Sequence, residues 1–147
     1  MRNVWILLGA TLLGAGIAHA HHSPIVFDHS RKIAITGSVT EFRWGNPHSW
    51  IHLDVKDEQG AVGHWSVEMN PANNLVREVW RASTLKPGDT VTVTVYPLRN
   101  NEQGGQFISI TLPDGLALGD SPDSGRAAVT LADYRSDRKS TRLNSSH

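Results

Sequence analysis

Two adjacent histidines near the start of the chain have the clearest capacity for chemistry. His21 and His22 directly follow the tripeptide Ala18-His19-Ala20. If the chain is cleaved after Ala20, His21 gains a free α-amine with a reference pKa of about 7.7, so part of it is neutral and can bind a metal at mildly alkaline pH. The amine and Nδ1 of His21 can then close a chelate ring on one ion. These positions therefore predict a metal site that depends on cleavage.

Two arrangements of ligands are open for such a site. In one, a second imidazole completes a nitrogen-rich plane around the ion, an environment that Cu(II) favours. The candidates for that imidazole are His22, His29, His48 and His52. In the other, the amine, the His22 amide nitrogen and the His22 imidazole bind Cu(II) without help from the fold. A histidine-rich terminus can also be a solvated cleavage product, so Cu(II) is a hypothesis for the cofactor.

The segment before these histidines, residues 1–20, has the features of a cleaved signal peptide. Arg2 supplies a positive charge, residues 4–17 form an apolar run, and Ala18-His19-Ala20 fits an A-x-A cleavage site. A membrane anchor would need roughly 20 apolar residues, and this run is shorter, with no basic stop beyond it. We therefore expect export to the periplasm, a mature start at His21 and no stable membrane insertion.

A second group of polar side chains is expected on one face of a β-hairpin. Alternating apolar residues in 51–55 and 65–69 flank the turn-forming segment 57–60, Asp-Glu-Gln-Gly. With that turn, polar residues pair across the strands on the face opposite the apolar set. The pairs are Trp50 with Glu68, His52 with Ser66, and Asp54 with His64. The candidate ligand-binding residues are therefore Trp50, His52, Asp54, His64 and Glu68.

This face also has a simpler interpretation. Cross-strand His/Asp pairs on a solvated strand contribute about 0.2–1 kcal/mol each without any ligand. His48, which follows Asn46-Pro47, can similarly be a donor that stabilises a turn. Trp44, Trp65 and Trp80 are expected in the core rather than on a stacking surface.

The elements that position these residues are mostly strands. Apolar residues alternate with polar ones from position 33, and the apolar phase then slips by one. The apolar positions are Ile33, Ile35, Gly37 and Val39 before the slip, and Phe42 and Trp44 after it. A period-2 pattern that changes phase predicts one long strand with a bulge or bend. Gly45-Asn46-Pro47 ends that strand.

A short helix is expected over residues 71–80. Asn70 is the predicted N-cap and Pro71 the first helical residue, and an apolar stripe ends at Trp80. After the turn at 86–89, alternating valines predict a strand, and a loop at 100–105 leads to a last strand.

The resulting order is β-β-β-α-β-β, with a bent first strand. It matches the OB fold, a small five-stranded Greek-key barrel that binds ligands on its second and third strands. We therefore expect an all-β fold with one short helix and an OB-like barrel, with an open sandwich as the alternative.

The chain is expected to hold one domain, residues 21–118. It has no cysteine, so packing alone must stabilise the domain, and roughly 100 residues can bury one adequate core. Residues 119–136 are rich in Asp, Gly and Ser and are expected to be disordered. Residues 137–147 resemble the conceptual translation of a common sequencing adapter and are set aside as an artefact.

The charge balance limits the expected partners. The full chain has 14 basic and 14 acidic residues, and removing both end segments leaves a mildly acidic chain with no Lys/Arg cluster. Nucleic-acid binders normally show a basic face, so nucleic acid is not an expected partner. An unknown protein or a small ligand is expected instead.

Enzyme signatures are absent from the sequence. It has no thiol nucleophile, no G-x-S-x-G elbow, no H-E-x-x-H motif and no phosphate-cradling glycine loop. Glu68 near His64 could be drawn as an acid/base pair, but any exposed sheet offers such pairs. No catalytic residues are assigned, and an enzyme is not expected.

Several short motifs together resemble a bacterial family of small exported domains of unknown function. The motifs are His21-His22-Ser23, Phe27-Asp28, Gly37-Ser38-Val39-Thr40, Trp44 with Asn46-Pro47-His48, Trp65 with Glu68, Leu75 with Trp80, and Lys86-Pro87-Gly88-Asp89. The sequence departs from that family twice: Glu78-Val79 precedes Trp80 where the family has a glycine, and residues 100–105 replace a shorter Asp-Gly turn. The resemblance implies periplasmic export and a small β fold, and it implies no reaction.

The sequence therefore predicts an exported binding or accessory module. One hypothesis is Cu(II) binding through the terminal histidines. The alternative is a small-ligand or protein-interaction module that uses the outer face of the second and third strands without a metal. A purely structural accessory subunit would use neither site.

Overall fold

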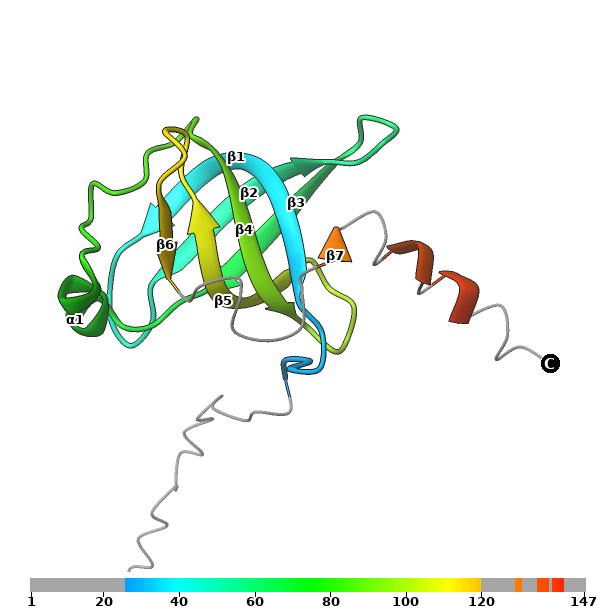
Figure 1. Cartoon of the computed structure of the whole chain (residues 1–147), viewed down its shortest axis with the longest axis horizontal. Coiled ribbons are helices and arrows are strands. Elements are labelled where there is room, and N and C mark those ends of the chain that lie inside the picture. Colours follow the sequence, from blue (N-terminus) through cyan, green and yellow to red (C-terminus); the bar gives the residue numbers. More distant parts are fainter. Residues whose placement is uncertain (1–25, 120–128, 131–134, 138, 142–147) are drawn as a thin grey trace, which may run out of the picture.

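Five strands close into a small barrel in the computed structural model of the chain, which describes residues 26–119, 129–130, 135–137 and 139–141 (Figure 1). The strands are β1 (Ile33–Arg43), β2 (Trp50–Lys56), β3 (Val62–Glu68), β4 (Thr90–Pro97) and β5 (Gly104–Thr111). They pair in the order β2-β3-β5-β4-β1, and β1 pairs with β2 to close the sheet. The predicted OB-like barrel is confirmed.

The barrel closes because β1 pairs with a different strand along each half. Residues 33–38 pair antiparallel with β4, and residues from Ser38 onward pair antiparallel with β2. The register with β2 shifts between Val39 and Glu41, which confirms the bulge predicted from the phase slip. A Cβ atom on Gly37 would lie 2.6 Å from the backbone oxygen of Asp54, so glycine is required for this close approach.

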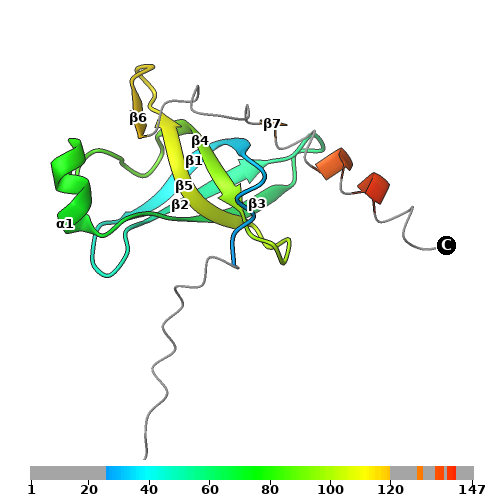
Figure 2. The same ribbon diagram turned by 60° about the horizontal axis from the view of Figure 1, so that its bottom comes forward.

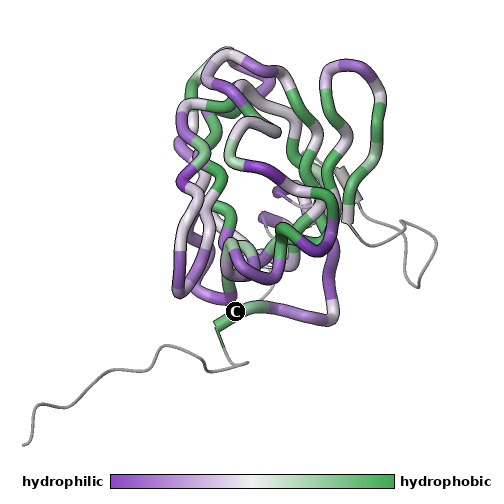
Figure 3. Tube along the Cα trace, turned by 90° about the vertical axis from the view of Figure 1, so that its left-hand side faces the viewer, coloured by the Kyte–Doolittle hydropathy of each residue, from purple (hydrophilic) through white to green (hydrophobic). Residues whose placement is uncertain are grey.

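Inward-facing aliphatic residues from all five strands form the core. Fully buried examples are Ile33, Ile35, Val39, Ile51, Leu53, Val67, Val91, Val93, Val95 and Ile110. Hydrophobic and hydrophilic residues alternate along the strands in Figure 3, as expected when one face of each strand packs inward. The predicted strand phases are therefore correct for β1 to β4, whereas β5 buries the consecutive residues Ile108, Ser109 and Ile110 beside a register shift against β4.

Two short strands add to the five that the sequence predicted. β6 (Ala117–Gly119) pairs antiparallel with the end of β5, and β7 (Val129–Thr130) pairs in parallel with the start of β1 (Figure 2). Most of the segment 119–136 lies outside the described residues. Residues 135–137 and 139–141 are helical, and Asp137 lies 3.7 Å from Arg31. An adapter origin of residues 137–147 stays a prediction.

The helix is shorter than predicted, and its cap was assigned wrongly. It consists of α1 (Ala72–Leu75) followed by one 3-10 turn, η1 (Val76–Glu78). The N-cap is Pro71 rather than Asn70, with ψ of 149° and no side-chain hydrogen bond to the helix. The helix stops early because the chain has to turn inward there to bury Trp80 completely. Its ring packs edge-on against Phe107, with centroids 5.5 Å apart.

Val79 makes that turn in a conformation that usually belongs to glycine. Its φ is 70°, in the left-handed region, and the next amide, of Trp80, donates to the carbonyl of Leu75 at 3.1 Å. This bond is the six-to-one bond of a Schellman motif, in which the left-handed position is normally glycine. Val79, at which the sequence departs from the family it resembles, is therefore a strained residue.

The segment before β1 is fixed to the loop between β4 and β5. Phe27 forms an isolated antiparallel bridge with Leu98, the amide of Asp28 donates to Pro97 O at 2.8 Å, and the amide of Arg99 donates to Val26 O at 3.0 Å. The Arg99 side chain adds a bond from Nε to Phe27 O at 3.1 Å. The start of the described chain is thereby anchored beside the barrel.

Asp28 organises this anchored segment through Ser30. Its carboxylate accepts the Ser30 hydroxyl at 2.6 Å and the Ser30 amide at 3.1 Å. The hydroxyl bond is the main reason that the pKa of Asp28 lies below its usual value; burial opposes the shift, and the Ser30 amide and the charges of Arg99 and Arg31 add to it. The ionised carboxylate therefore stabilises the fold.

Val79→Gly should stabilise the protein. Glycine removes the strain of a β-branched residue in the left-handed region, and this gain is partly offset by the greater entropy of glycine in the unfolded chain. The free energy of unfolding should rise by about 0.5–1 kcal/mol. For a domain of this size, Tm should rise by about 2–8 °C, as measured by calorimetry. The matched control is Val76→Gly, because Val76 is also exposed but has a helical φ of −55°. That variant should lower Tm, and an equal effect of both changes would contradict the argument from φ.

Asp28→Asn should reduce stability at neutral pH and have a smaller effect in acid. Because the folded pKa is depressed, the contribution of Asp28 is present above its ordinary value of 3.8 and is lost as the pH falls through the folded pKa. Urea unfolding from pH 7 to about pH 2.5 measures the difference between variant and wild type. Ser30→Ala should reproduce part of the loss, and a difference that grows in acid would refute the role assigned to this carboxylate.

Candidate functional site

The strands β2 and β3 present the predicted polar residues together on one outer face of the barrel. Their register pairs Trp50 with Glu68, His52 with Ser66, and Asp54 with His64, which are the pairs expected from the sequence. The intervening Leu53 and Val67 are buried, so the alternation turns the polar set away from the core. We define the β2–β3 face by these residues: Trp50, His52, Asp54, His64, Ser66 and Glu68.

His52 is held in one orientation at the centre of this face. Its Nδ1 lies 3.0 Å from Ser66 Oγ, and its Nε2 lies 3.2 Å from a terminal guanidinium nitrogen of Arg43. A guanidinium can only donate, so Nε2 accepts and the ring proton lies on Nδ1, which donates to Ser66. The two contacts select one tautomer.

Trp50 lies next to His52 with its ring plane parallel. The ring centroids are 6.4 Å apart and the planes differ by 7°. Both residues are half-buried, so each ring is supported by the sheet and still reaches the surface. The pair presents flat aromatic groups on one strand.

Two further imidazoles on or beside the face contact carboxylates. His64 Nδ1 lies 2.6 Å from Asp54 Oδ1. His48 Nδ1 lies 3.1 Å from Glu68 Oε1 and 3.2 Å from Met69 O. Because these neighbours are acceptors, Nδ1 is the donor in both histidines. His48 also ties the loop after β1 to the end of β3, which agrees with its predicted role as a turn-stabilising donor.

Arg43 and Glu41 belong to the same surface, although they were not among the predicted site residues. Arg43 pairs with Trp50 and Glu41 with His52 across the β1–β2 seam. The Glu41 carboxylate lies 3.8 Å from Arg43 Nε and 3.9 Å from His52 Nε2. The phase slip before Phe42 already implied that 41 and 43 point outward, but their neighbours follow only from closure of the barrel.

The histidines proposed as metal ligands are only partly visible in this structure. His21 and His22 lie outside the described residues. His29 Nε2 lies 2.9 Å from Gln106 Oε1, and its ring packs edge-on against Tyr96 at 4.7 Å. Gln106 pairs with Glu68, the carboxylate that contacts His48. In the part of the chain that the structure describes, no three His, Asp or Glu side chains form a group that could hold a metal.

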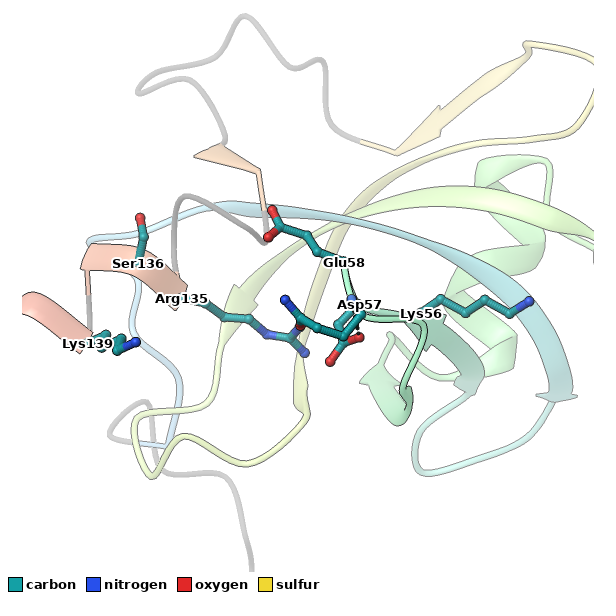
Figure 4. A pocket seen from close by; sticks show the side chains of 7 residues that line it. Lys56, Asp57, Glu58, Arg135, Ser136 and Lys139 are labelled. Carbon is teal, nitrogen blue, oxygen red and sulfur yellow. Dashed lines mark hydrogen bonds between the residues drawn. The ribbon is translucent and has the colours of Figure 1, made fainter.

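An open hollow lies beside the β2–β3 turn (Figure 4). Its lining consists of Lys56, Asp57, Glu58, Gln59, Arg135, Ser136 and Lys139. Lys139 belongs to the segment that resembles a translated adapter. None of the residues of the β2–β3 face lines this hollow.

Comparison with known proteins gives little on function. No curated protein matches the chain. A solved structure of the mitochondrial single-stranded DNA binding protein Rim1 from S. cerevisiae is similar, with 15% sequence identity and a TM-score of 0.42, over 58% of this chain and 93% of that one. Among the described residues, no helix has the length and apolar character needed to cross a membrane.

The expectation that nucleic acid is not a partner was wrong. The match that contradicts it is the structure described above, which is that of a single-stranded DNA binding protein. The low identity and TM-score of the match carry no argument about what this chain itself binds.

A protein-family model gives the clearest relationship. It matches residues 10–107 and is described as a family of unknown function. The motifs quoted from the sequence, from Phe27-Asp28 to Lys86-Pro87-Gly88-Asp89, lie within that match. Because the match spans most of the chain, the protein belongs to DUF6152, a family of unknown function.

Proposed function

We propose that the protein is an exported, periplasmic binding module that takes its ligand on the β2–β3 face. The observation that carries this proposal is the parallel pair of Trp50 and His52, with the imidazole fixed by Ser66 and Arg43. Binding sites gain affinity when their groups are oriented before the ligand arrives, because less ordering is needed on association. Strands two and three are also the surface that OB-like barrels commonly use for ligands.

The outer surface of β1 and β4 shows what a plain solvated sheet looks like in the same molecule. Thr36 and Thr92 bond to each other there at 2.8 Å, and Thr94 follows on the same strand face. Threonine suits such a position without any ligand. The indole and the imidazoles on β2 and β3 are the departure from that pattern, and ligand binding accounts for them.

Thermal unfolding in the presence of different ligand classes tests the proposal. The panel contains neutral oligosaccharides, amino acids, short peptides and oligonucleotides. A ligand at a hundred times its Kd adds about 2.7 kcal/mol of stability, so one class should raise Tm by several degrees. Trp50→Thr and His52→Thr should remove that rise while keeping a residue that favours strands.

The matched control is Thr92→Ala, which lies on β4 and should keep the full rise in Tm. Circular dichroism should verify that all variants fold. A rise that survives in both Trp50→Thr and His52→Thr would place the ligand elsewhere and refute the proposal. A panel with no effect on wild type would count against it equally.

Cu(II) binding at the mature terminus is a second candidate. The observation that favours it is the anchored segment: residues 26–28 are fixed to the β4–β5 loop, and His29 contacts Gln106 beside Glu68. His21 and His22 stand a few residues before this anchor in the sequence. An imidazole or carboxylate at this edge, from His29, His48 or Glu68, could then complete a terminal site.

Protein that begins at His21 should bind one Cu(II) more tightly than Zn(II), as measured by competition with a chelator. Nitrogen ligands place copper above zinc, and binding should weaken from about pH 8 to about pH 5 because it needs a neutral amine and neutral imidazoles. An added residue before His21 should abolish the site. If Cu(II) affinity is lost in His21→Ala but not in His22→Ala, the second imidazole ligand comes from elsewhere in the fold. The variants His29→Ala and His48→Ala then identify it. Unchanged affinity in the extended protein would show that the amine is not a ligand.

A further inference from the structure

We infer that the ligand of the β2–β3 face is an uncharged oligosaccharide, an inference that rests on the proposed binding role of that face. OB-like barrels bind oligonucleotides and oligosaccharides on the same pair of strands. The chemistry of the face therefore has to distinguish the two. Its flat rings, its paired hydrogen-bonding groups and its charge balance each bear on the choice.

The rings of Trp50 and His52 supply flat surfaces. A pyranose ring has an apolar side formed by its C–H groups, which packs against an indole as other apolar groups pack against aromatic rings. The His52 ring stacks parallel to the indole, with planes within 7° of each other, and so holds the indole in place for such a contact. A nucleobase could also stack here, so the rings alone leave both ligand classes possible.

The groups around the rings match hydroxyl chemistry. Each sugar hydroxyl both donates and accepts, and neighbouring hydroxyls present these functions side by side. In the pairs His64–Asp54 and His48–Glu68 the imidazole donates its Nδ1–H to the carboxylate, at 2.6 and 3.1 Å. A carboxylate has about four acceptor positions, so one bond to histidine leaves it able to accept from a hydroxyl. Such pairs therefore offer acceptors to the hydroxyl protons of a sugar.

The charge of the face favours a ligand without phosphate groups. The carboxylates are Glu41, Asp54 and Glu68, and the guanidinium is that of Arg43. Each carboxylate is already partnered, Glu41 by Arg43 at 3.8 Å and the other two by histidines. A phosphate chain gains affinity from a surplus of Lys and Arg, and the face has three carboxylates and one guanidinium. A saccharide without charged groups needs no such surplus.

The length of the face indicates more than one sugar unit. Trp50 and Asp54 are four residues apart on β2, which corresponds to about 13 Å at the rise of a strand. Their partners Glu68 and His64 mark the same two ends on β3. One pyranose ring covers only part of this distance, so an oligosaccharide can engage the rings and both histidine–carboxylate pairs.

Titration calorimetry with defined probes tests the inference. The saccharide probes are hexamers of α-1,4-linked glucose, β-1,4-linked glucose and β-1,4-linked N-acetylglucosamine, and the comparison probe is a twelve-residue thymidine oligonucleotide. At least one hexamer should bind wild type, and Trp50→Thr should weaken it about tenfold or more through lost stacking. Trp50→Phe should restore part of the affinity, Asp54→Asn with Glu68→Gln should weaken it, and Thr92→Ala should leave it unchanged.

The possible outcomes separate this inference from the proposed function. If the oligonucleotide or another ligand class binds with dependence on Trp50 and no hexamer does, the saccharide assignment is wrong and the binding face stands. If a hexamer binds equally well to Trp50→Thr and His52→Thr, the site lies elsewhere and both proposals fail. Absence of binding by every probe also overturns both. Binding that strengthens at low salt and vanishes at high salt would point to a charged ligand and contradict neutrality.

Discussion

Closure of the barrel at Gly37 is the constraint on which the rest of the structure depends. A side chain there would collide with the backbone of Asp54, 2.6 Å from the nearest atom, so the missing Cβ allows β1 to leave β4 and join β2. The bulge after Val39 then turns β1 along its new partner. This change of partner encloses the aliphatic core, and it also brings Arg43 beside His52 on the outside. The core and the candidate site thus follow from one close approach between two strands.

The parts of the fold that local rules determine could be predicted from the sequence. Alternation fixes which residues of β2 and β3 point inward, so the pairing of Asp54 with His64 was predictable. The hairpin itself closes with the Asp57 amide donating to Ala61 O at 2.9 Å, one residue beyond the expected turn at 57–60. The helix was less predictable because two local preferences competed there. Asn70 suits an N-cap, but Pro71 is the N-cap in the structure. The helix also ends before its apolar stripe does, because Trp80 is buried in the core. Tertiary packing overrode local propensity at both ends.

The candidate site was predictable only where it lies within one hairpin. Arg43 and Glu41 join it across the β1–β2 seam, a contact between distant parts of the chain that requires the bulge to be placed correctly. The contact of His29 with Gln106 depends on the anchoring of residues 26–28 by backbone bonds, for which side-chain periodicity gives no signal. His21 and His22 lie outside the described residues, so the terminal metal site is still a prediction. The tautomer of His52 also depends on hydrogen-bond partners such as Arg43, so it could not be predicted from the sequence.

The paired seam between β1 and β2 also bears on solubility. A free strand edge exposes unpaired N–H and C=O groups, which can recruit a strand from another molecule, and closed barrels remove such edges. A residue larger than glycine at position 37 would part this seam and release two edges at once, one on each strand. With no cysteine in the chain, no disulfide could hold the opened strands together. A substitution there would therefore favour association between molecules, so that the damage would be seen first in the amount of protein that stays in solution.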